Sequence, residues 1–203
     1  MVFALQAQTF RVEAEYSQPR IYSSEISNRY FNGFSLGATA EFDIPQVSFL
    51  TLQTGILYSY SFGNNAQKFQ STDSIRINTQ GHQLNIPIHL QASQTIFRVI
   101  RGFVFAGPNI NIGLSIPQRV ETSTANPDWW NIANLNGFYQ LGTTDLYSDR
   151  LRRFNLQMDT GLGAEWWRLQ VKSGYSFGLN NLSKMDFHKQ HQSGWFVSIG
   201  YRF

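Results

Sequence analysis

The chain closes with GWFVSIGYRF, residues 194–203, and this stretch decides the fold. Every second side chain is apolar up to the last residue, so these side chains share one face of a strand. They are Trp195, Val197, Ile199, Tyr201 and Phe203. Chain ends in water are usually poorly ordered. A strand that stays apolar to its last position therefore indicates that this face does not meet water.

The same period of two recurs along the chain, while helical periodicity is hard to find. The repeating stretches are QTFRVEAEYS (8–17), GFSLGATAEF (33–42), TLQTGILYSYSF (51–62), GHQLNIPIHLQA (81–92), NINIGL (109–114), FNLQMDTGLGAEW (154–166) and LQVKSGYSFGL (169–179). With the closing stretch they predict about eight strands. Most reach the ~10 residues of a tilted strand that crosses a bilayer, which is longer than the strands of a soluble sandwich.

The predicted connections alternate in length. The long ones are residues 18–31, 63–80, 117–150 and 181–193, and the short ones are 43–49, 93–101 and a tight turn near Trp166-Trp167. Long loops at one end and short turns at the other are typical of a transmembrane barrel. An even number of strands would place both termini on the periplasmic side.

Aromatic residues are sorted by height along these strands. One rim is expected to carry Tyr16, Tyr58, Tyr60, Phe62, Tyr175, Phe177 and Trp195, and the other Phe10, Phe42, Phe49, Trp166, Tyr201 and Phe203. Two aromatic girdles around an aliphatic band match the two interfaces of a bilayer. The sequence thus predicts an all-β fold, an eight-stranded antiparallel up-and-down transmembrane β-barrel. A soluble lipocalin-like carrier, with the apolar face inside, is the alternative fold.

Composition narrows the class further. The 203 residues fit one domain, cysteine is absent, and only 14% of the residues are charged. No run of Lys or Arg indicates a nucleic-acid partner, and no apolar stretch has the length of a membrane-spanning helix. MVFALQA, residues 1–7, resembles the end of a secretory signal peptide, so the barrel domain is expected over 8–203.

Several stretches carry a family resemblance. QLNIPIHLQA (83–92), FVFAGPNINIGL (103–114), GLGAEW (161–166) and VKSGYSFGLNNLS (171–183) resemble the PorT family of outer-membrane β-barrel proteins, which is similar to the small OmpX and OmpA barrels. The terminal Phe203, with the alternating Trp195, Val197, Ile199 and Tyr201 before it, resembles the signal that the barrel-insertion machinery reads in Gram-negative bacteria. The resemblance implies an outer-membrane location among lipid and lipopolysaccharide. Some PorT-like proteins are linked to secretion of surface proteins.

Charged side chains on the polar face are expected to fill the barrel interior. They are Arg11, Glu13, Glu15, Glu41, Asp159, Glu165, Lys172 and Arg202. Since an eight-stranded barrel is just filled by side chains, we expect paired charges that plug the interior. A gate or narrow ion path is the alternative.

The four histidines offer little chemistry. His82 is expected near the loop-side rim with no serine two residues away, and His89 points inward without a nucleophile beside it. His188 and His191 have a spacing that could bind a metal if their loop were helical, but a polar loop tip is the simpler interpretation. We therefore predict no catalytic residues, no metal and no cofactor.

Two further features remain open. Pro87 and Pro108 sit inside predicted strands, and a bulge near Gly107-Pro108 would also explain an apparent switch of the apolar phase. The alternative is that Phe103 and Phe105 face inward as core.

The longest predicted loop contains four large aromatics, Trp129, Trp130, Phe138 and Tyr139, which could cap the barrel or contact a protein or glycan partner. The sequence thus predicts a non-enzymatic outer-membrane scaffold, surface interaction module or accessory subunit. A small pore or uptake protein is the alternative, and a lipid-modifying enzyme comes third.

Overall fold

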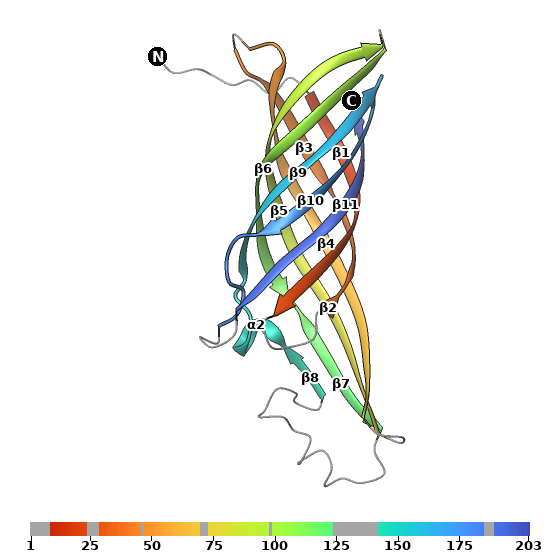
Figure 1. The fold of residues 1–203 in the computed structure, drawn as a ribbon, viewed down its shortest axis with the longest axis vertical. Helices are drawn as coiled ribbons and strands as arrows, with labels where there is room; N and C mark the ends of the chain where they lie inside the picture. The colour runs from red at the N-terminus through yellow and green to blue at the C-terminus, as the bar shows by residue number, and fades with distance from the viewer. Residues whose placement is uncertain are drawn as a thin grey trace.

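Eight antiparallel strands form a closed ring (Figure 1). The computed structural model describes residues 9–23, 29–45, 47–69, 73–97, 99–123, 142–184 and 189–203. The ring strands are β1 (Thr9–Ser23), β3 (Asn32–Asp43), β4 (Leu50–Phe69), β5 (Asp73–Phe97), β6 (Ile100–Ser115), β9 (Phe154–Trp166), β10 (Leu169–Gly178) and β11 (Gln190–Arg202). Their order around the ring is β4-β3-β1-β11-β10-β9-β6-β5, and pairing of β4 with β5 closes it.

The closing strand pairs on both sides. β11 pairs with β10 and also with β1, from Arg11 opposite Arg202 to Ser23 opposite Gln190. An unpaired backbone amide in hydrocarbon costs several kcal/mol, so only a ring without a free edge is stable there. The C-terminal stretch, residues 194–203, therefore joins the two ends of the chain into one barrel.

The side chains alternate as the sequence predicts. Val171 and Ile199 are about half exposed on the outside, whereas their neighbours Lys172 and Ser198 are each 2% exposed inside the ring. The same alternation runs along the other ring strands, with a few inward apolar exceptions, which are Leu57, Phe103, Phe105 and Phe196. This arrangement excludes the lipocalin-like alternative, because there the apolar faces would be packed together in a dry interior.

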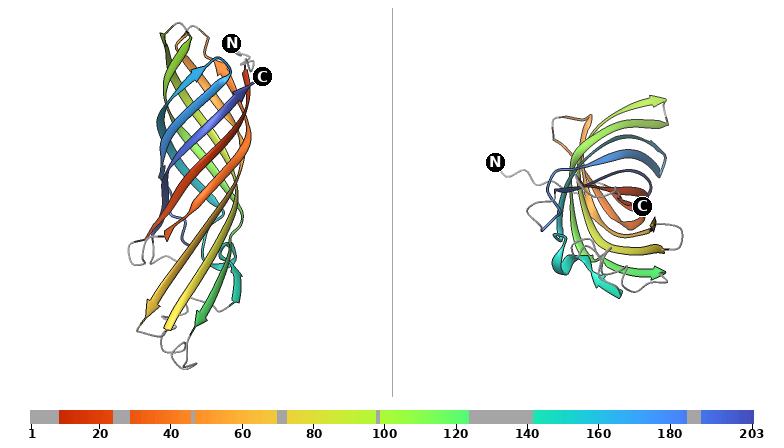
Figure 2. Two further views of the ribbon diagram at one scale, coloured as in Figure 1. Left: turned by 90° about the vertical axis from the view of Figure 1, so that its right-hand side faces the viewer. Right: turned by 60° about the horizontal axis from the view of Figure 1, so that its bottom comes forward.

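The two ends of the barrel differ. Both termini and the short turns lie at one end, which we call the terminal end, and the long connections lie at the other, the loop end (Figures 1 and 2). The short link at 43–49 agrees with the sequence prediction. The turn between β9 and β10 is only Trp167-Arg168, with Trp167 in the left-handed region at φ 56°. The predicted turn at 93–101 is shorter, since β5 runs to Phe97 and β6 begins at Ile100.

The predicted long loops are partly strands, which corrects the sequence analysis. Residues 63–80 are wrong as a loop, because β4 continues to Phe69 and β5 starts at Asp73. The other long connections contain β2 (Arg29–Tyr30), β7 (Pro117–Ser123), β8 (Gly142–Asp145) and the helix α2 (Leu146–Asp149). These segments carry only short apolar alternations, such as Ile75 and Ile77, so their sequence gives little sign of a strand.

Four strands reach past the ring at the loop end. They are the end of β4 from Gly63, the start of β5 up to Thr79, and β7 and β8, and we call this part the extension (Figure 2, left). Ile77, Thr79 and Val120 are buried on one of its faces. Arg76, Gln80 and Arg119 are exposed on the other.

The predicted bulge at Gly107-Pro108 is wrong. The register of β5 against β6 is the same before and after this site, with Pro87 opposite Asn109 and Leu90 opposite Ala106. Phe103 and Phe105 point inward and are 5% and 3% exposed, as in the alternative interpretation. The strand phase therefore does not switch at Gly107-Pro108, and the register shifts of this strand pair lie elsewhere, at His82/Gln83 and Thr95/Phe97.

The aromatic rims are present in the structure. At the loop-side rim, the Tyr16 ring centroid lies 5.3 Å from that of Phe34 and 5.5 Å from that of Trp195. At the terminal end, the rings of Tyr201 and Phe203 are 5.6 Å apart. All five residues of the predicted insertion signal point outward and are exposed. No helix among the described residues is long and apolar enough to cross a membrane.

Candidate functional site

An ion cluster closes the interior at the terminal end. Arg11 is 1% exposed and donates to Glu41 at 2.5 Å and to Glu165 at 2.9 Å. Arg101 reaches Glu41 at 2.9 Å, and Arg202 reaches Glu165 at 2.8 Å. Three guanidinium groups thus hold two carboxylates from strands on opposite sides of the ring. The sequence analysis missed Arg101 because it placed this residue in a turn.

A second ion pair lies further inside. Lys172 contacts Glu13 at 2.7 Å, and both side chains are almost fully buried. Gln53 accepts from Lys172 at 3.3 Å and from Gln91 at 2.6 Å, and it donates to Thr39 at 3.2 Å. Each charge is therefore paired and held by neutral hydrogen bonds, the condition under which buried ions are tolerated.

Three phenylalanines fill the middle of the ring beside this pair. Phe103, Phe105 and Phe196 form one buried cluster. The neighbouring strand β9 carries glycines directly beside two of these rings, and a Cβ added at Gly163 would lie 2.3 Å from Cζ of Phe103. A Cβ at Gly161 would lie 2.6 Å from Cζ of Phe105. The glycines of β9 thus make the room that lets large rings sit inside a small barrel.

His89 and Asp159 form a third contact. His89 Nε2 and Asp159 Oδ2 are 3.0 Å apart, and each side chain is 2% exposed. Asn109 donates to the same carboxylate oxygen at 3.0 Å. His89 points inward as predicted, and its ring centroid also lies 5.0 Å from that of Phe105.

The half of the interior nearer the loop end is polar and not fully packed. A cavity of about 40 Å³, which we call the chamber, is lined by Glu15, Asn85, Asn109, Asn111, Gln157 and Gln192, among others. Glu15 accepts from Ser35 at 3.3 Å, Ser35 and Ser59 are 2.6 Å apart, and Asn85 donates to Ser59 at 2.6 Å. The structure thus places all eight predicted lumen residues on the inner face, together with His89, and it adds Arg101 to them.

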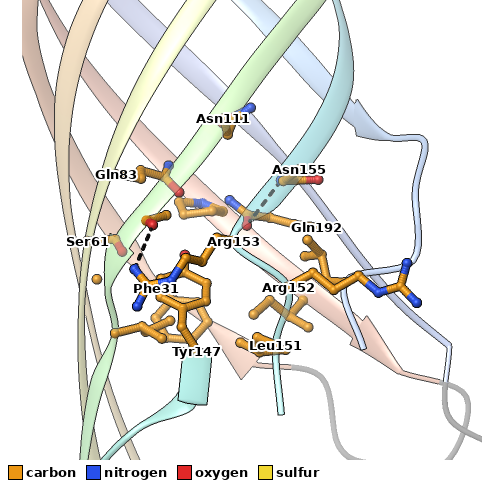
Figure 3. Close-up of a pocket in the computed structure, with 16 residues that line it drawn as sticks. Phe31, Ser61, Gln83, Asn111, Tyr147, Leu151, Arg152, Arg153, Asn155 and Gln192 are labelled. Carbon is orange, nitrogen blue, oxygen red and sulfur yellow. Dashed lines mark hydrogen bonds between the residues drawn. The ribbon is translucent and has the colours of Figure 1, made fainter. Parts of the chain in front are cut away.

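A plug covers the chamber at the loop end (Figure 3). Ile116, Leu146, Leu151 and Leu182 form a buried apolar cluster against which Tyr147 packs. Lys184 donates to the backbone carbonyls of Tyr147 and Ser148 in α2 at 2.7 and 2.8 Å. A cavity of only about 30 Å³ separates this plug from the polar side chains below it.

A larger groove lies on the exposed face of the extension. Its volume is about 470 Å³, and its lining includes Tyr60, Phe62, Asn78, Gln80 and Arg119. Phe62 also stacks with Phe34 at 6.3 Å, so the groove begins where the loop-side aromatic rim ends. Arg119 additionally pairs with Glu121 at 2.8 Å, and both side chains are exposed.

The remaining predicted residues add no catalytic geometry. His82 lies on the outer face, and its Nδ1 is 2.6 Å from the hydroxyl of Tyr58. His188 and the four loop aromatics Trp129, Trp130, Phe138 and Tyr139 lie outside the described residues. Within the part of the chain that the structure describes, no group of three or more His, Cys, Asp or Glu side chains could hold a metal ion.

An antiparallel ring with a polar, ion-paired interior and an apolar belt between aromatic rims defines a transmembrane β-barrel. The chain belongs to the family described as outer membrane protein beta-barrel domain, whose model matches residues 6–184. The protein is therefore an outer-membrane protein. No curated protein matches the chain.

Solved structures of small barrels are similar to this chain. Neisserial surface protein A shares 12% identity with a TM-score of 0.45, covering 96% of this chain and 97% of that one. The attachment invasion locus protein Ail of Yersinia pestis shares 12% identity with a TM-score of 0.40, covering 98% and 100%. The N-terminal barrel of OprF from Pseudomonas aeruginosa shares 13% identity with a TM-score of 0.33, covering 98% and 100%.

Proposed function

We propose that the protein is a non-enzymatic surface interaction module of a Gram-negative outer membrane. In this proposal the barrel is an anchor surrounded by outer-membrane lipid and lipopolysaccharide. The terminal end, with both termini, faces the periplasm, and the loop end faces outward. The single observation that carries the proposal is the contrast between a plugged, ion-paired interior and an extension that stands beyond the ring with a polar groove.

The interior supports an anchor rather than a passage. The two cavities described above measure about 30 and 40 Å³, which is room for only about two or three water molecules each. Charged side chains from opposite strands cross the lumen below them, and α2 covers it above. We expect purified protein in planar bilayers to give no stable conductance. Large, long-lived openings would contradict the proposal and favour the alternative of a small pore.

The extension supports contact with a partner. Aromatic rings, amides and a guanidinium line one groove, and aromatic side chains and Arg are enriched where proteins bind each other. The connection between β7 and β8 also holds Trp129 and Trp130, which we propose as part of this surface. A secretion complex, as the PorT resemblance implies, is one setting for such a partner. Before the protein can bind a partner, the C-terminal strand β11 would be recognised by the machinery that inserts the barrel into the outer membrane.

The experiment compares two variants of the extension. The triple change Asn78→Ala, Gln80→Ala and Arg119→Ala alters the groove, whereas Arg76→Ala changes an exposed residue of the same face that does not line it. After cross-linking in native membranes, we expect a partner that co-purifies with the wild type and with Arg76→Ala to be lost from the triple variant. Heat-modifiable gel migration reports whether each barrel is folded.

Two results would contradict this assignment. A partner retained by the folded triple variant would remove the extension from the proposal. A change in lipid A mass on deleting the gene would indicate a lipid-modifying enzyme, with the outward His82 and Tyr58 as the first residues to test.

A further inference from the structure

The chamber contains a carboxylate without a cationic partner. Among the described residues, no Lys, Arg or His lies within ion-pair distance of Glu15, which accepts a hydrogen bond from Ser35 at 3.3 Å. Lys172, the basic residue that pairs with Glu13 at 2.7 Å, is already used. A carboxylate kept from bulk water needs either its proton or a positive charge.

The hydrogen bonds around Glu15 have one consistent direction. Ser35 donates to the carboxylate, so its oxygen is left to accept from Ser59, 2.6 Å away. The Ser59 oxygen in turn accepts from the amide nitrogen of Asn85 at 2.6 Å. An ionised carboxylate only accepts hydrogen bonds, so a relay of donors running toward Glu15 is compatible with a charged group at this position.

The same relay turns unpartnered oxygens toward the chamber. Because the Asn85 nitrogen is used on Ser59, its Oδ1 remains without a partner, and Asn85 is only 7% exposed. Asn109 must likewise direct its nitrogen at the Asp159 carboxylate, and its Oδ1 is also unpartnered. Both asparagines and Glu15 line the chamber.

We propose that the chamber binds one small monovalent cation, such as Na⁺, between Glu15, Asn85 and Asn109. Hard cations are held by carboxylate, amide and water oxygens, and carboxylate and amide oxygens line this chamber. A volume of about 40 Å³ has room for an ion with about one or two water molecules. Glu15 is the one carboxylate among the described residues that line the chamber, which favours one positive charge over two.

The cation ties together strands that are distant around the ring. Glu15 belongs to β1, whereas Asn85 and Asn109 belong to β5 and β6. Binding in the folded state alone stabilises that state in proportion to the logarithm of ion concentration. The site would therefore act as an internal staple beneath the plug.

The test uses the full-length barrel in a sodium-free detergent buffer at constant ionic strength. We expect the unfolding midpoint, read from heat-modifiable migration, to rise as NaCl replaces choline chloride. Equilibrium dialysis with radioactive sodium should give one bound ion per barrel. Glu15→Gln should abolish both the stabilisation and the binding.

Glu121→Gln is the matched control, because Glu121 is an exposed carboxylate outside the chamber. It should keep the full response to sodium. Equal midpoints in sodium and choline, with no ion bound, would mean that the chamber holds water only and would overturn the proposal. A sodium response that survives in folded Glu15→Gln would overturn it as well.

Discussion

The Lys172–Glu13 pair shows how a charged residue is kept inside this barrel. The two groups are 2.7 Å apart and about 1 to 2% exposed, so neither can be solvated by bulk water. Gln53 and Thr39 complete their hydrogen bonds. The two buried charges are tolerated because each has the other as its ion-pair partner and a neutral side chain as a hydrogen-bond partner. Loss of one partner leaves a buried charge with no compensation.

Lys172→Met should therefore destabilise the barrel strongly. It leaves the Glu13 carboxylate buried and unpaired, a change that costs about 3–5 kcal/mol. Urea unfolding of the reconstituted protein, followed by tryptophan fluorescence, measures this free energy. Glu121→Gln, which breaks an exposed pair, should cost less than about 1 kcal/mol.

The double variant Glu13→Gln, Lys172→Met separates charge from packing. It removes both charges, so much of the lost stability should return relative to Lys172→Met alone. A double variant as unstable as the single one would show that the lysine acts through packing and not through its charge.

Residue orientation was largely predictable from the sequence, because a strand allows only two faces. Once Val171 and Ile199 are assigned to lipid, Lys172 and Ser198 must point inward. The partners were not predictable. The pairing of Arg11 with Glu165, for example, depends on which strands face each other across the ring.

At the scale of elements, the glycines of β9 and the phenylalanines of β6 are one packing unit. Gly163→Ala would place a Cβ 2.3 Å from Phe103, which overpacks a filled interior. We expect a loss of about 1–3 kcal/mol in the same urea experiment. Adding Phe103→Leu should restore part of it. No recovery would show that the backbone carbonyl of Val171, 2.7 Å from the added Cβ, sets the limit instead.

The plug should respond to alkaline pH through Tyr147. Burial raises the pKa of Tyr147, the Asp145 carboxylate raises it further, and Arg153 lowers it. A raised pKa means that the closed plug holds this proton more tightly than the open one. Its contribution is thus complete below the ordinary tyrosine pKa and is lost as the pH rises through the raised value.

Limited proteolysis at increasing alkaline pH can detect this opening. We expect cleavage near residues 146–153 to increase above the ordinary tyrosine pKa in the wild type. Tyr147→Phe cannot ionise and should show no such step, while the ring stays intact in both. An identical step in both proteins would assign the opening to another group.

The extension and the plug are the elements that sequence reasoning missed. Residues 63–80 were expected to be a loop, because Asn64, Gln67 and Lys68 give no apolar face. In the structure β4 and β5 remain paired there, from Gly63 opposite Thr79 to Phe69 opposite Asp73. Backbone pairing continues beyond the bilayer, where side chains no longer need to face lipid, so hydrophobic period carries no signal.

For the whole molecule, the bilayer explains why apolar side chains cover the outside of the barrel while polar side chains fill its interior. A soluble sheet buries its apolar face, whereas this ring exposes Leu36, Leu162 and Ile199 around its belt. The lipid solvates that belt, closure satisfies the backbone, and the interior needs only paired charges and a few rings. The family assignment, an outer-membrane β-barrel domain, is consistent with a lipid bilayer around this belt.

The most direct measurement is the lipid accessibility of spin labels on neighbouring residues. The chain has no cysteine, so a single cysteine can be introduced and spin-labelled at one position at a time. The positions are Val171 and Ile199 and their neighbours Gln170 and Ser198. In reconstituted bilayers, oxygen dissolved in the acyl chains should relax the labels at Val171 and Ile199. Labels at Gln170 and Ser198, each 2% exposed, should be protected. The reverse pattern would contradict the account.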